Sequence, residues 1–147
     1  MYAVSNFCQL KKVIKMTLNN KNIYIVDDDE SICRSLKTYL MTFEFDVRTF
    51  NSAKSFFETV SNDDPGCLVL DIHMPGIDGW AMQKIIFDSG SKRPVIFISA
   101  EKQDNAADRA VKVGAVGFLQ KPFNGQTLVD LINVASESTD GMAKMAQ

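Results

Sequence analysis

Five polar side chains follow short apolar segments of this 147-residue sequence and could act together on a phosphoryl group. The segments IYIV, LVL, VIFI and GFLQ lead directly into Asp27 and Asp28, Asp71, Ser99 and Lys121, respectively. Carboxylate oxygens suit Mg²⁺, which uses one or two carboxylates and keeps several waters. A lysine and a hydroxyl beside that ion could hold phosphoryl oxygens, and an aspartate can accept the group covalently. These residue types indicate Mg²⁺-dependent phosphoryl chemistry, provided that the fold brings them together.

Asp71 is the best candidate for the phosphoryl acceptor. It stands apart from the other acids and closes the most apolar segment, where a fixed geometry is easiest to hold. Each residue also has a simpler interpretation by itself. The run 27–29 could cap the start of a helix, which aspartate favours, while Ser99 and Lys121 could be ordinary loop residues. Their shared position at the ends of similar segments favours a common site.

Short apolar segments alternate with helical patterns along the chain. Strands are predicted at 22–27, 45–50, 67–71, 94–99 and 116–121. Helices are predicted at 29–43, 52–60, 78–88, 104–113 and 124–136. Most of the strands are apolar on both faces, which is typical of parallel sheets covered on both sides, whereas 45–50 alternates like an edge strand. The order predicts an α/β protein with a doubly wound five-stranded parallel sheet and right-handed crossovers.

The helical patterns also predict which side chains are buried. In 29–43 the apolar residues fall on one face that ends with Phe43, and in 78–88 they include Trp80 and Ile85. In an open parallel sheet the functional crevice lies at the carboxyl ends of the strands. The five polar candidates all stand at or just past such ends, so four strands deliver them to one edge.

Composition limits the kind of protein and its partners. Apolar residues make up 46% and charged residues 23%, and the formal net charge of −2 suggests neither a nucleic-acid nor a membrane partner. No apolar run approaches the ~20 residues of a membrane span, and the start is a poor signal peptide. The cysteines Cys8, Cys33 and Cys67 fit no zinc or redox motif, and the last two are predicted core residues. We expect a cytoplasmic protein.

One domain is predicted over residues 21–137. Residues 1–20 precede the first periodic pattern and are expected to form a flexible N-terminal extension. Beyond Ser136 the chain becomes polar and small, so residues 138–147 are expected to form a frayed C-terminal tail.

The sequence resembles the receiver domain of bacterial response regulators in two-component systems, the CheY-like family. The similarity covers residues 21 to about 137 and rests on VDDDES, LVLDIHMPGIDGW, VIFISA and GFLQKPF, in that order. It implies a flavodoxin-like (βα)5 fold with strand order 2-1-3-4-5. It also implies a phosphoprotein that carries an aspartyl phosphate within a phosphorelay for signal transduction.

The resemblance implies a role for each site residue. Asp28, Asp71 and the backbone carbonyl of His73 would hold Mg²⁺, with Asp27 acting mostly through water. Asp71 would accept the phosphoryl group, and Lys121 would pair with one of its oxygens. Ser99 and Phe118 would be the switch residues, and the bond from Lys121 to Pro122 would be cis. The changed surface would be formed by the helices at 104–113 and 124–136 and the strand between them.

Partners follow from the same resemblance. The donor would be a sensor histidine kinase or a phosphotransfer protein, and the target a downstream protein or an output domain missing from this chain. A phosphorylation-dependent homodimer is a further expectation. The alternative is a Mg²⁺-dependent phosphohydrolase with an aspartyl-phosphate intermediate, but a non-enzymatic receiver is expected because His73 stands where such enzymes need an acid.

Two side chains keep two interpretations. The His73 imidazole could tune hydrolysis of the acyl phosphate or have no role. Trp80 could be a docking residue or, more commonly for an aromatic at helical spacing, a packing residue.

Overall fold

The computed structural model describes residues 21–100 and 105–145, with side chains described up to residue 136. One sheet holds β1 (Asn22–Val26), β2 (Asp46–Phe50), β3 (Cys67–Asp71), β4 (Val95–Ser99) and β5 (Gly117–Gln120). The strand order is β2-β1-β3-β4-β5, and all neighbouring strands are parallel. The helices are α2 (Glu30–Met41), α3 (Ala53–Thr59), α4 (Gly79–Asp88), α5 (Ala106–Lys112) and α6 (Gly125–Met145). The predicted fold class, strand order and edge position of β2 are confirmed.

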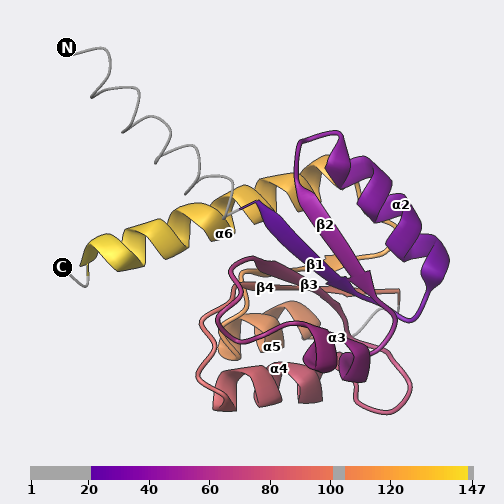
Figure 1. Ribbon diagram of the computed structural model, residues 1–147, viewed down its shortest axis with the longest axis horizontal. Coiled ribbons are helices and arrows are strands. Elements are labelled where there is room, and N and C mark those ends of the chain that lie inside the picture. The colour runs from indigo at the N-terminus through magenta and orange to yellow at the C-terminus, as the bar shows by residue number, and fades with distance from the viewer. Residues whose placement is uncertain (1–20, 101–104, 146–147) are drawn as a thin grey trace.

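Two helical layers cover the sheet (Figure 1). Helices α2 and α6 lie on one face, and α3, α4 and α5 lie on the other. Strand side chains alternate between the two cores: Leu68 and Leu70 of β3 face α3 to α5, whereas Val69 faces α2 and α6. Burial on both faces explains why β3 and β4 are apolar at nearly every position. Packing on both sides therefore holds the carboxyl ends of these strands in place.

Short polar side chains begin three of the helices. Asp29 caps α2, and its carboxylate accepts hydrogen bonds from two backbone N–H groups of the first turn at 2.9 and 3.3 Å. Ser52 and Asp78 cap α3 and α4 in the same way. The helix-cap interpretation of the aspartate run thus holds for Asp29 and leaves Asp27 and Asp28 for another purpose.

Two side chains are less buried than their helical patterns predicted. Helix α2 ends at Met41, and Phe43 lies in the turn beyond it, 37% exposed. Glu44 takes a left-handed φ of 67° there, which redirects the chain toward β2. On α4, Met82 and Ile86 occupy the core, whereas Ile85 points outward and is 43% exposed.

The end of α6 corrects a second prediction. The helix continues to Met145 instead of ending at Ser136. Loss of the apolar pattern predicted the end of the helix, but the segment contains no proline, and a helix that is already formed extends without the cost of a new nucleus. Gly141 alone costs only about 1 kcal/mol in a helix interior. The N-terminal extension predicted at 1–20 lies outside the described residues, and the domain limits stay predictions.

Candidate functional site

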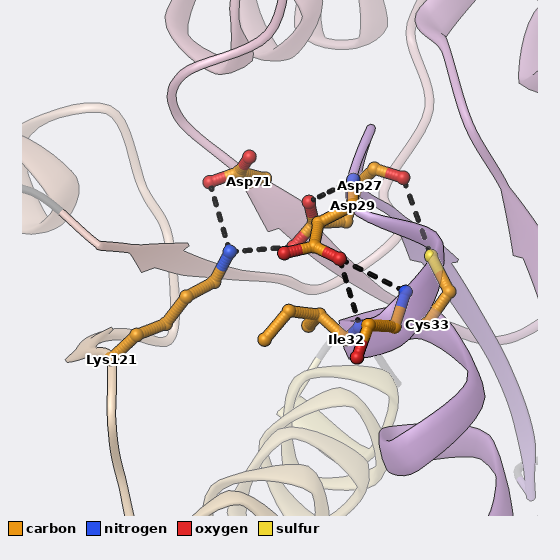
Figure 2. A network of polar contacts seen from close by, with 7 residues as sticks. Asp27, Asp29, Ile32, Cys33, Asp71 and Lys121 are labelled. Atoms are coloured by element: carbon orange, nitrogen blue, oxygen red, sulfur yellow. Dashed lines mark hydrogen bonds and ion pairs between the residues drawn. The ribbon is translucent and has the colours of Figure 1, made fainter.

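The predicted site residues meet at the carboxyl edge of the sheet. Figure 2 shows Asp27, from the end of β1, and Asp71, the last residue of β3, on either side of the Lys121 ammonium group. The Lys121 Nζ lies 2.7 Å from Asp27 Oδ2 and 3.6 Å from Asp71 Oδ1. Both carboxylates are almost completely buried. One cation therefore joins two acids that lie 44 residues apart in the sequence.

Asp27 is fixed by the backbone around it. Its N–H donates to the carbonyl of Phe50 at 3.0 Å, and its Oδ1 accepts from the N–H of Asp29 at 2.9 Å. The Cys33 thiol donates to its carbonyl oxygen at 3.3 Å. With Oδ2 bound to Lys121, every polar group of Asp27 has a partner. This residue is consequently a fixed part of the site.

Lys121 reaches the acids from the loop after β5. Its N–H donates to the Ser99 carbonyl at 2.7 Å, so the two predicted residues are joined through the backbone. The Lys121–Pro122 peptide bond is cis, as predicted. Ser99 ends β4 and is fully buried, which places it at the same edge as Asp71 on the neighbouring strand.

The strand that ends at Asp71 is tied to the start of α4. The N–H of Gly79 donates to the Ile72 carbonyl at 2.8 Å. A side chain on Gly79 would collide with the Asp71 carbonyl oxygen and would lie 2.8 Å from the Ile72 Cα. The glycine that follows the aspartate in the sequence IDGW is thus required by close packing of α4 against Asp71 and Ile72.

Asp27, Asp28 and Asp71 form a group of carboxylates suited to a divalent cation. One oxygen from each lies within 4.8 Å of the others. Asp28 is exposed, so an ion can approach from solvent while the two buried acids supply fixed ligands. Hard oxygen donors with an open solvent side fit Mg²⁺, which retains several of its waters. The residues present therefore fit the predicted ion.

Burial and crowding change the proton affinity of the site. Burial, followed by the charge of Asp27, raises the pKa of Asp71 from 3.8 to about 7, against the opposing charge of Lys121. Burial by itself lowers the pKa of Lys121, but its hydrogen bond to Asp27 and the charges of both acids raise it overall. Lys121 thus stays charged, whereas ionised Asp71 gains from an additional cation.

The other predicted residues lie around this centre. Phe118 is half-buried in β5 and packs against the core that β3, β4 and α3 to α5 share. His73 is exposed in the loop after β3, two residues past Asp71. Sequence reasoning missed the Cys33 contact and the packing reason for Gly79. A cysteine four residues into a helix gives no sign of its hydrogen bond, but the glycine in IDGW could have been questioned.

Comparison with known proteins identifies the fold and its family. The family model described as "Response regulator receiver domain" matches residues 23–133. The chain belongs to the response regulator receiver domain family. Transcriptional regulatory protein TdiR of Thauera aromatica is 40% identical over 119 residues, which cover 81% of this chain and 52% of TdiR. Transcriptional regulatory protein FixJ of Bradyrhizobium diazoefficiens is 33% identical over 84% of this chain and 60% of its own length.

Solved structures agree with this assignment of the receiver domain. Response regulator StyR matches with a TM-score of 0.77 at 35% identity, covering 86% of this chain and 65% of that chain. FixJ-N matches with a TM-score of 0.72 at 33% identity, covering 79% of this chain and 93% of that one. The chain spans about half the length of the first curated relatives it matches. Within the described residues, no helix is both long and apolar enough to cross a membrane.

Proposed function

We propose that this receiver accepts a phosphoryl group on Asp71 from a histidine of a sensor kinase or phosphotransfer protein. The observation that carries the proposal is the placement of Asp71 beside Lys121 and two further carboxylates at one edge of the sheet. Asp71 is the less tightly paired of the two buried acids, since Lys121 lies closer to Asp27. It can therefore take a new partner without breaking the strongest ion pair.

The transfer exchanges one bond to phosphorus for another. An Asp71 carboxylate oxygen attacks the phosphorus of a phosphohistidine, and the phosphorus–nitrogen bond breaks with its electron pair going to the imidazole. Lys121 pairs with an equatorial oxygen of the group in transfer. Asp28, Asp71 and the His73 carbonyl, with Asp27 through water, would hold a Mg²⁺ ion that offsets the negative charge. Asp27 holds the lysine in position throughout.

The signal would leave through β4 and β5. The new acyl phosphate offers acceptor oxygens to the Ser99 hydroxyl and the Lys121 ammonium, which form charge-assisted hydrogen bonds only in the phosphorylated state. Ser99 would rotate toward the phosphate, and Phe118 would move into the space it leaves. The surface of α5, β5 and α6 would then change its packing and its partner.

The output is proposed from the relatives. TdiR and FixJ are named transcriptional regulatory proteins, so we infer that this receiver controls transcription in the cytoplasm. The control would pass to an output domain or a separate protein, or through a phosphorylation-dependent homodimer. Its binding surface would be the face of α5, β5 and α6.

Mass spectrometry after incubation with a small acyl phosphate and Mg²⁺ tests the acceptor. The wild-type protein is expected to gain one phosphate and Asp71→Asn none, while Asp63→Asn, at an exposed turn, labels like the wild type. Phosphate that persists on Asp71→Asn would refute Asp71 as the acceptor. Release of many phosphates per protein without a pause would instead support the phosphohydrolase alternative.

A further inference from the structure

A groove between α4 and α5 lies apart from the phosphoryl site. It encloses about 460 Å³. One wall comes from α4 and holds Trp80, Gln83, Lys84 and Phe87. The other comes from α5 and the turn after it and holds Arg109, Lys112, Val113 and Gly114. Figure 1 shows these helices together on the same face of the sheet. Neither the acceptor nor its lysine lines this groove, which has the shape of a trough between two helices.

Two residues that line the groove hold buried polar atoms without hydrogen-bond partners in the described part of the chain. Gln83 is only 8% exposed; its Nε2 donates to the Val113 carbonyl at a long 3.5 Å, and its Oε1 has no hydrogen bond from any described residue. The Trp80 Nε1 is likewise buried without a partner among these residues. Buried polar groups are nearly always hydrogen-bonded in complete proteins. One acceptor and one donor at the base of a trough therefore indicate a surface that is completed by a ligand.

One large apolar side chain of the groove stays in solvent. Phe87, which lines the groove on α4, is 71% exposed. An exposed aromatic ring in a groove between two helices favours a macromolecular partner over a small molecule. An amphipathic helix is the element that fills such a trough between two helices.

The charged side chains that line the groove are all basic. Lys84, Arg109 and Lys112 line it, and no carboxylate is among its described lining residues. The Arg109 guanidinium lies 4.3 Å from the centre of the Trp80 ring, so one cation is already held against the apolar wall. Cations along an apolar trough complement a helix with acidic flanks.

We propose that the α4–α5 groove docks an amphipathic helix with acidic flanks from a partner protein. Apolar side chains of the partner, spaced three and four residues apart, lie against Trp80, Phe87 and Val113. Its carboxylates face Lys84 and Lys112, and a donor near its end reaches Gln83. This docking does not depend on Asp71 being a phosphoryl acceptor, and the groove gives a function to the outward orientation of Phe87.

Selection of peptides tests both the place and the chemistry. A display library of random helical peptides is selected on the full chain, and the enriched peptides are titrated by calorimetry against variants. We expect acidic peptides with apolar residues at helical spacing, which bind Lys84→Glu/Lys112→Glu at least about tenfold more weakly. Phe87→Ala should also weaken binding. Lys37→Glu, an exposed lysine on α2 across the sheet, is the matched control and should bind normally.

These variants change exposed side chains, and unchanged melting curves verify that they fold. Failure to enrich any peptide, or enrichment of peptides without an acidic amphipathic pattern, would overturn the proposal. Equal affinity for the wild type and the Lys84→Glu/Lys112→Glu variant would overturn it as well, because the peptides would then bind elsewhere.

Discussion

Lys121 treats the two buried acids of the site unequally. It lies 0.9 Å closer to Asp27 (2.7 Å) than to Asp71 (3.6 Å), and three further hydrogen bonds hold Asp27, two to backbone groups and one from the Cys33 thiol. Asp71 is left with a raised pKa of about 7, for which burial and then Asp27 are the main causes. Asp27, which positions the lysine, is thus strongly paired, whereas Asp71, which we propose reacts, is weakly paired.

This imbalance gives a pH dependence of stability. Between the unfolded pKa of 3.8 and the folded value of about 7, folded Asp71 holds more protons than unfolded Asp71, so the free energy of unfolding falls as pH rises. Asp71→Asn removes the buried charge. Without divalent cations, the free energy of unfolding of the variant, relative to that of the wild type, should rise by on the order of 1–3 kcal/mol from about pH 5 to about pH 8.5. Urea unfolding at both pH values measures this gain, and a difference independent of pH would contradict the raised pKa.

Mg²⁺ should offset the repulsion among the clustered carboxylates of the site. Because a ligand that binds only the folded state stabilises it, millimolar Mg²⁺ should raise the melting temperature of the wild type by a few degrees, roughly 1–3 kcal/mol. Asp28→Asn should lose most of that gain, whereas Asp63→Asn should keep it. Differential scanning fluorimetry measures the shifts, and a melting temperature that does not change with Mg²⁺ would argue against this metal site.

At the scale of elements, α4 packs closely on the strand that ends at Asp71 because Gly79 has no side chain. Gly79→Ala puts a Cβ against the backbone of Asp71 and Ile72, which cannot move aside as a side chain can. Gly117→Ala is the control, because its Cβ would lie 3.3 Å from the flexible Leu131 side chain.

Gly79→Ala should lower the free energy of unfolding by about 2–3 kcal/mol, and Gly117→Ala by less than about 1 kcal/mol. Urea denaturation gives both values. Equal losses would show that the packing of α4 on the strand that ends at Asp71 is not as close as described. Slower labelling of Gly79→Ala by acyl phosphate is expected in addition.

The elements show where sequence patterns suffice. Strands β1, β3 and β4 were predictable because burial on both faces demands apolar residues at nearly every position. The orientation of Ile85 was not, because helical spacing alone does not say how wide the buried stripe is. The end of α6 was missed because a helix that is already formed can extend into a polar segment without the cost of a new nucleus.

At the scale of the molecule, the parallel topology assembles the site. Because the carboxyl ends of parallel strands share one edge of the sheet, the sequence predicted that four residues lie together there: Asp27, Asp71, Ser99 and Lys121. The residue types alone did not divide the aspartate run, since caps and ligands demand the same residue type, and the family resemblance assigned Asp27 and Asp28 to the site. Asp29 is a cap only because α2 begins there. The unequal distances to Lys121 and the raised pKa of Asp71 depend on burial, which the sequence does not give.

The topology also predicts which elements respond to phosphorylation. Ser99 ends β4 and Lys121 follows β5, and these strands lead into α5 and α6. Beryllofluoride, which mimics the phosphoryl group, should change amide hydrogen exchange over 105–125 more than over 45–65, because the new contacts exist in only one state. Ser99→Ala should bind the mimic but show a weaker change. A response centred on α3 instead would refute this route for the signal.

The place of Trp80 gives the protein an optical property. It is the only tryptophan in the chain, and its indole lies 4.5 Å from the Phe97 ring and 4.3 Å from the Arg109 guanidinium. Phe97 precedes Ser99 by two residues on β4, and Arg109 belongs to the next helix along the chain. Movement of a charge relative to an indole changes the wavelength and intensity of its fluorescence. All tryptophan fluorescence of the unlabelled protein therefore comes from the junction of α4, β4 and α5. Stopped-flow fluorescence can thus measure the rates of changes there without an attached dye.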